Sequence, residues 1–140
     1  MNDQASLHRE RFALEIWRDG TCQVKPHVTL TAALIEDMAR TARTLIRTRH
    51  GVCGIILDVR GRCPLSIVRL SSLIDRLSEP DLPLVVLFSE TRHQRVADLL
   101  HNTLANNKRV AYTTDPTQAR AYIQAAINGS HSQHPGYLRP

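Results

Sequence analysis

Cys63 and Arg69 have the spacing of a phosphate-binding nucleophile pair, between a predicted strand and a predicted helix. Cysteine phosphatases use Cys-x5-Arg because the thiolate attacks phosphorus while the Arg binds the phosphoryl oxygens. The intervening Pro-Leu-Ser-Ile-Val contains no glycine, and β-branched residues fit poorly in a loop that needs unusual φ angles. The residues therefore favour an ordinary loop cysteine, and a cysteine-dependent phosphatase or sulfurtransferase-like enzyme using Cys63 and Arg69 is the alternative.

A carboxylate ends the same predicted strand, where Asp58 stands beside Arg60 and Arg62. Such a carboxylate more often pairs with an Arg than acts as a general acid or base. No second carboxylate or His stands at a fixed spacing that would make a catalytic pair with it. We therefore predict an Asp58–Arg pair and no catalytic residue.

Further cations follow the next predicted strand, where Arg92 and Arg95 open a predicted helix. Cations at a helix start are unfavourable against the helix dipole, which suggests placement for an anionic partner. Ligands of open α/β sheets bind beyond the carboxyl ends of the strands. We therefore expect a basic rim that binds an acidic protein surface, an anionic lipid head or a nucleotide. The rim comprises Asp58, Arg60, Arg62, Ser66, Arg69, Arg92 and Arg95.

Other basic and metal-ligating residues give weaker signals. Arg40, Arg43 and Arg47 form a stripe on a predicted helix, and Glu36 is expected to pair with Arg40 at i, i+4. Aromatic residues are only 4% of the chain, too few for a base-stacking platform, so nucleic acid is not an expected partner. A metal site or cofactor is not expected either, because the only closely spaced His pair lies in a polar tail without further ligands. That pair is His131 and His134.

Composition bounds the class of protein. The chain has 140 residues, 42% of them hydrophobic, and a net charge of +5, which fits one soluble domain. Its apolar runs are shorter than the roughly 20 residues that a membrane span needs. Three cysteines without a CxxC pair argue against a disulfide framework and for a reducing cytoplasm.

Hydrophobic periodicity predicts alternating strands and helices. Alternation predicts a hairpin around Asp19-Gly20, and continuous apolar runs predict two strands buried on both faces. Asp115-Pro116 is a helix start, and Thr29 or Thr31 can cap the first helix. The expected strands are 11–17, 21–25, 52–59, 82–88 and 109–113; the expected helices are 34–50, 65–77, 96–104 and 116–128.

The expected fold is α/β, a five-stranded mixed sheet with four helices in the order β-β-α-β-α-β-α-β-α. Residues 11–129 form a single domain in this prediction. Residues 1–10 are expected to be a flexible arm and residues 130–140 a mobile tail, because neither carries an apolar pattern.

Short motifs over residues 11–128 resemble the STAS domain of SpoIIAA-like anti-sigma factor antagonists, within a poorly characterised branch. They are the opening strand with "RDGTCQV", the "GIILDVRG" strand and turn, and "PLSIVRL". The "LPLVVLFSETRHQRVADLL" unit and the closing "RVAYTTDPTQARAYI" complete the resemblance.

This resemblance implies a non-enzymatic regulatory or binding module of bacteria, with an anti-sigma factor or kinase-like protein as partner. Family members are regulated by phosphorylation at the start of the second helix, where this chain has Ser66 without the usual glycine. Phosphate there would gain from the helix N-terminus and from Arg62 or Arg69, whereas the simpler interpretation is that Ser66 caps the helix. A lipid or nucleotide ligand and self-association as a homodimer remain alternatives.

Overall fold

A computed structural model describes residues 5–8, 11–61, 66–78, 82–89, 110–127 and 136–137. The chain is an α/β protein built on one mixed sheet. The strands are β1 (Ala5–His8), β2 (Phe12–Ile16), β3 (Thr21–Pro26), β4 (Gly54–Asp58), β5 (Leu84–Leu87), β6 (Val110–Thr113) and β7 (Gly136–Tyr137). The described helices are α1 (Ala32–Thr48), α2 (Ile67–Leu77) and α4 (Pro116–Ile127).

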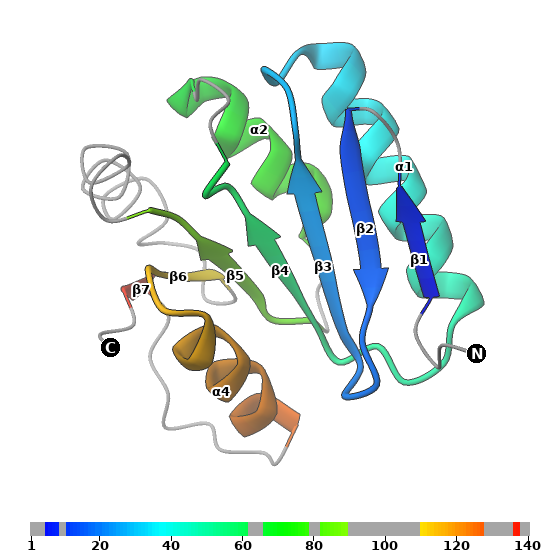
Figure 1. The fold of residues 1–140 in the computed structure, drawn as a ribbon, viewed down its shortest axis with the longest axis vertical. Helices are drawn as coiled ribbons and strands as arrows, with labels where there is room; N and C mark the ends of the chain where they lie inside the picture. The colour runs from blue at the N-terminus through cyan, green and yellow to red at the C-terminus, as the bar shows by residue number, and fades with distance from the viewer. Residues whose placement is uncertain are drawn as a thin grey trace.

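The strands lie in the sheet in their order along the chain. β1, β2 and β3 are antiparallel neighbours, whereas β3 to β7 run parallel. Figure 1 shows α1 and α2 on one face of this sheet and α4 on the other. The parallel strands β3 to β6 therefore end at one common edge of the sheet, where the loops after β4 and β5 begin.

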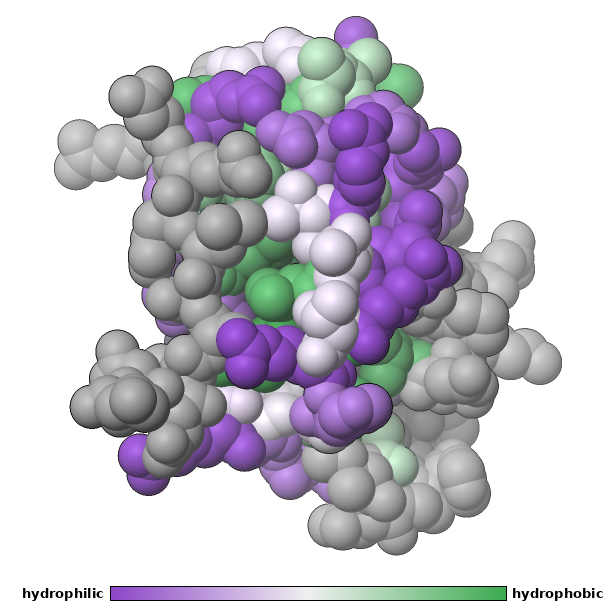
Figure 2. Space-filling model, turned by 90° about the vertical axis from the view of Figure 1, so that its right-hand side faces the viewer, coloured by the Kyte–Doolittle hydropathy of each residue, from purple (hydrophilic) through white to green (hydrophobic). Residues whose placement is uncertain are grey.

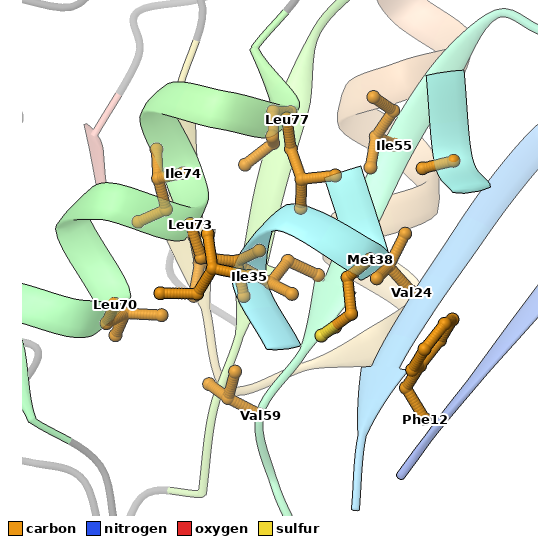
Figure 3. Close-up of a cluster of buried hydrophobic side chains, with 14 of the residues drawn as sticks. Phe12, Val24, Ile35, Met38, Ile55, Val59, Leu70, Leu73, Ile74 and Leu77 are labelled. Atoms are coloured by element: carbon orange, nitrogen blue, oxygen red, sulfur yellow. The ribbon is translucent and has the colours of Figure 1, made fainter. Parts of the chain in front are cut away.

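Two apolar clusters hold the layers together, one on each face. In the larger cluster, side chains of α1 and α2 such as Met38 and Leu73 pack on β2 to β6 (Figure 3). In the smaller cluster, α4 packs on β4, β5 and β6 through Ala119, Tyr122 and Ile123. Each buried Leu, Ile, Val or Phe side chain contributes about 1.5–3 kcal/mol. Residues of β4 and β5 belong to both clusters, which explains why these two strands have consecutive apolar residues rather than an alternating pattern.

All five strands and three of the helices expected from the sequence are present, and two strands were not expected. β1 lies within the expected arm and pairs with β2, and β7 lies within the expected tail and pairs with β6. The expected helix over residues 96–104 lies outside the described residues. The expected caps are confirmed: Thr31 Oγ1 accepts from Leu34 N at 3.1 Å, and Asp115 Oδ1 from Thr117 N at 2.9 Å.

The arginine stripe of α1 pairs differently from the expectation. Glu36 forms its ion pair with Arg76 of α2 rather than with Arg40, because packing brings the second helix beside the first. Arg43 also reaches that helix and donates to the carbonyl oxygen of Arg76 at 3.3 Å.

Figure 2 shows the side of the molecule on which α1 lies, where hydrophilic residues gather in a broad band. Within the described parts of the chain, no helix is long and apolar enough to cross a membrane.

The β2–β3 hairpin turns at Gly20 in a space that only glycine fits. Its φ is 90°, in the left-handed region that L side chains rarely adopt. A Cβ on Gly20 would lie 2.2 Å from the carbonyl oxygen of Gly51 and 3.0 Å from Cys53 Sγ. The backbone there is fixed, because Cys53 N donates to the carbonyl oxygen of Gly20 at 2.9 Å. Gly20 thus lets the hairpin contact the loop that leads into β4.

Gly51 provides a matched control for this contact, because its φ is 88° but a Cβ on it would meet nothing within 4 Å. We expect Gly51→Ala to lower the free energy of unfolding by about 1–2 kcal/mol, from backbone strain alone. Gly20→Ala should lower it by at least ~1 kcal/mol more, because overpacking adds to the strain. Urea unfolding followed by circular dichroism measures both. Equal losses in the two variants would contradict the close approach.

Candidate functional site

The candidate site begins with a buried carboxylate at the end of β4. Asp58 is the last residue of that strand, and its side chain is 1% exposed. Its neighbours Leu57 and Val59 belong to the larger apolar cluster, so Asp58 points to the other face, the one that α4 covers. A buried carboxylate is tolerated only where hydrogen bonds and a countercharge replace the lost water.

Four donors supply that replacement. Asp58 Oδ1 accepts from Arg60 N and Arg60 Nε, each at 3.0 Å. Asp58 Oδ2 accepts from Arg60 Nη2 at 2.9 Å and from Gln23 Nε2, on neighbouring β3, at 3.2 Å. The predicted Asp58–Arg pair is therefore confirmed. Because both carboxylate oxygens are occupied, Asp58 serves to position Arg60.

Arg60 is the side chain that this arrangement holds in place. Its hydrogen bonds to Asp58 outweigh its partial burial and raise the pKa of its guanidinium. The guanidinium has five N–H groups in one plane, and Asp58 takes one from Nε and one from Nη2. The side chain is 40% exposed. Its outer edge, with Nη1 and the second N–H of Nη2, has the geometry that binds a further carboxylate or phosphate with two parallel bonds.

The buried pair should matter more for stability than an exposed pair of the same chemistry. We expect Asp58→Asn to lower the free energy of unfolding by about 1–3 kcal/mol, because charge-assisted hydrogen bonds in a buried place are lost. Asp37→Asn is the control, since Asp37 pairs with Arg11 at 2.6 Å where the two side chains are 28% and 48% exposed. That change should cost less than about 1 kcal/mol. Chemical denaturation at pH 7 compares them, and equal costs would show that the burial of Asp58 is unimportant.

Ser66 and Arg69 lie at the start of α2. Ser66 is the exposed N-cap residue, and its Oγ accepts from Arg69 N at 3.4 Å. The capping role of Ser66 is thus confirmed, whereas its phosphorylation stays a prediction. Arg69 is exposed, and beside it Val68 is 77% exposed, a large apolar side chain in water. Among the residues that the structure describes, no hydrogen bond or ion pair joins Ser66 or Arg69 to the Asp58–Arg60 pair.

The rest of the expected rim lies outside the described residues, as does the cysteine of the enzyme alternative. These residues are Arg62, Cys63, Arg92 and Arg95. Of the seven rim residues, the structure therefore brings together Asp58 and Arg60, and separately Ser66 and Arg69. The participation of the others stays a prediction, and so does the alternative that uses Cys63.

Gln23 and Lys25 were missed by sequence reasoning. Sequence alternation places them opposite the core residues Cys22 and Val24, so they read as ordinary solvent-facing positions. Their proximity to Asp58 follows from the register of β3 against β4, in which Gln23 is level with Ile56. That pairing joins residues more than 30 positions apart, and no local pattern encodes it.

A second charged cluster lies at the other end of the strands, where β3 and β4 begin, and joins α4 to the β2–β3 hairpin. Arg120 of α4 forms an ion pair with Asp19 at 2.7 Å, and its guanidinium carbon lies 4.6 Å from the ring centroid of Trp17. Burial raises the pKa of Asp19, but the hydrogen bonds from Arg120 and Thr21 outweigh this, and the pKa lies below its ordinary value. Cys53 donates its thiol proton to the carbonyl oxygen of Asp19 at 3.2 Å. These contacts fix the hairpin against the last described helix.

The lowered pKa of Asp19 makes its contribution to stability pH-dependent. A carboxylate with a depressed folded-state pKa stabilises the fold above its unfolded-state pKa, and this gain is lost as the pH falls through the folded-state pKa. We therefore expect Asp19→Asn to lower the free energy of unfolding by up to about 1 kcal/mol at pH 7. The difference from the wild type should shrink as the pH falls below about 4 and vanish below the lowered pKa of Asp19. Urea titrations across that range measure it, with Asp75→Asn, an exposed acid on α2, as control.

Metal and thiol chemistry find no support in the described residues. No group of three or more His, Cys, Asp or Glu that could hold a metal ion occurs among them. His131 and His134 lie outside the described residues. Burial raises the pKa of the Cys22 thiol to about 12, and it also raises the pKa of Cys53, with a smaller effect from Asp19. Neither thiol is therefore an activated nucleophile.

Comparisons of the chain with protein-family models, with curated proteins and with solved structures found no match.

Proposed function

We propose that the chain is a non-enzymatic, STAS-like regulatory or binding module of bacteria that recognises an anionic group on a protein partner or small ligand. The observation that carries the proposal is the clamped Arg60. A buried carboxylate positions its guanidinium at the carboxyl ends of the parallel strands, and the Arg60 side chain is 40% exposed. Such an arrangement supports binding because little side-chain entropy remains to be lost when the ligand arrives.

The non-enzymatic part of the proposal rests on the saturation of Asp58. A general acid or base needs a free oxygen within reach of the substrate. Asp58 is buried, and Arg60 and Gln23 occupy both of its oxygens. Binding without turnover therefore fits this group better than proton transfer.

The module is proposed to act in the reducing cytoplasm, because an odd number of cysteines without a CxxC pair is not typical of a disulfide-bonded protein. An anti-sigma factor or kinase-like protein is the partner class that the resemblance to the STAS family implies. The exposed Val68 beside Arg69 supports a protein partner, because a large apolar side chain in water gains from being covered.

Anion binding by Arg60 is tested with a fluorescein-labelled hexaglutamate peptide, followed by fluorescence anisotropy in low salt. We expect Arg60→Ala to weaken binding at least about fivefold, because charge-assisted hydrogen bonds contribute ~1.5–3 kcal/mol each. Arg60→Lys should recover only part of the loss, since Lys lacks the planar fork. Arg40→Ala, on the outer side of α1, removes one exposed charge elsewhere and serves as the control.

Two results would overturn this proposal. Equal affinity of Arg60→Ala and Arg40→Ala would show that the peptide reads only net charge. Hydrolysis of an aryl phosphate by the wild type that Cys63→Ser abolishes would establish the enzyme instead. Circular dichroism of each variant at the assay temperature ensures that a loss of binding is not a loss of folding, because Arg60→Ala leaves a buried carboxylate short of its countercharge.

A further inference from the structure

A second cation lies beside the clamped Arg60 on the same face of the sheet. Lys25 is two residues beyond Gln23 on β3, so both side chains point to the face on which Asp58 lies. The parallel register pairs Val24 with Leu57, which places Lys25 level with Asp58 at the next step. Lys25 is half-buried. The register thus places Lys25 on the strand beside Asp58, to which Gln23 and Arg60 are hydrogen-bonded.

This part of the sheet face carries no described helix. α4 packs on β4, β5 and β6, and in Figure 1 it lies in front of that half of the sheet, while α1 and α2 lie behind it. Neither β2 nor β3 has a described helix in front of it. On β3 the side chains of Gln23 and Lys25 are half-buried, unlike the fully buried Ile56 under α4. On this side Arg60 is 40% exposed and Lys25 is half-buried.

The charges around the site limit what it can bind. Arg60 and Asp58 cancel each other, so Lys25 leaves the group with a net charge of about +1. Glu15 of β2 is level with Gln23, and its carboxylate accepts from Trp17 Nε1 at 3.1 Å, so a further negative charge lies on the next strand. Counted with Glu15, these four charged groups sum to about zero, so Asp58 and Glu15 repel a ligand with one negative charge less than a ligand with two. A doubly charged phosphate monoester would be repelled by Asp58 and Glu15.

We infer that Arg60, Lys25 and Gln23 form a site for a single carboxylate, supplied by an Asp or Glu side chain of an acidic protein segment. This inference rests on the proposed function and names its partner chemistry. The outer edge of the Arg60 guanidinium binds the two carboxylate oxygens, and Lys25 neutralises the added charge. Gln23 has two amide N–H groups, of which Asp58 takes one.

The test uses the full chain and the same labelled hexaglutamate peptide. We expect Lys25→Gln to weaken binding about two- to fivefold, the range of a partly exposed ion pair. Lys25→Arg should stay within about twofold of the wild type, because the charge is retained. Arg40→Gln again controls for the loss of one positive charge. Acetate and inorganic phosphate are then added separately at constant ionic strength, and acetate should displace the peptide at least as well as phosphate.

The outcomes separate this inference from the proposed function. If Arg60→Ala weakens binding but Lys25→Gln matches Arg40→Gln, the carboxylate site is wrong and the proposed function stands. If neither Arg60→Ala nor Lys25→Gln differs from Arg40→Gln, both fail. Two further results would overturn the inference in favour of a phosphate group as ligand. One is that phosphate displaces the peptide better than acetate does. The other is that Lys25→Gln weakens binding to vesicles of anionic lipid more than it weakens binding to the peptide.

Discussion

The central parallel strands must be buried on both faces, and the rest of the structure follows from this constraint. All four residues of β5 and the three central residues of β4 have large apolar side chains, so each face needs a helical cover. α1 and α2 cover one face and α4 the other. Of the described helices, only α4 lies on its face, and it packs on β4, β5 and β6. β2 and β3 each have one buried apolar face, and on the other face they carry polar residues such as Glu15, Gln23 and Lys25. The candidate site lies at the border between the covered and the polar half.

Asp58 is the exception within a run of apolar residues, and its position explains the form of the site. One step earlier in β4 it would lie in the larger apolar cluster, away from Gln23. Asp58 lies two residues after Ile56, which pairs with Gln23 of β3. At this position Gln23 Nε2 and the backbone N–H of Arg60 both donate to its carboxylate. A charge in such a place is stable only when its partners are complete. The same bonds that stabilise Asp58 therefore set the orientation of Arg60.

Much of the fold could be predicted from the sequence, because short stretches of consecutive residues show the hydrophobic periodicity of a strand or a helix. The alternation of β2, the apolar runs of β4 and β5 and the capped starts of α1 and α4 are each contained in a few consecutive residues. β1 and β7 were not predicted, because short edge strands carry no apolar run. Pairs between elements were also beyond local reasoning: Glu36 reaches Arg76 rather than Arg40. Asp58–Arg60 was predicted because its members are two residues apart, whereas Gln23 and Lys25 join the site only through register.

The ion pair between Asp19 and Arg120 joins two parts of the chain that are 101 residues apart. During synthesis the hairpin and β4 leave the ribosome long before α4 does, at about 5–20 residues per second. For those seconds one face of β4 and β5, with Ile56, Val85 and Leu87, has no cover from α4. The protein therefore completes its second cluster late, and the nascent chain is most open to aggregation or to chaperone binding on the face that α4 finally covers.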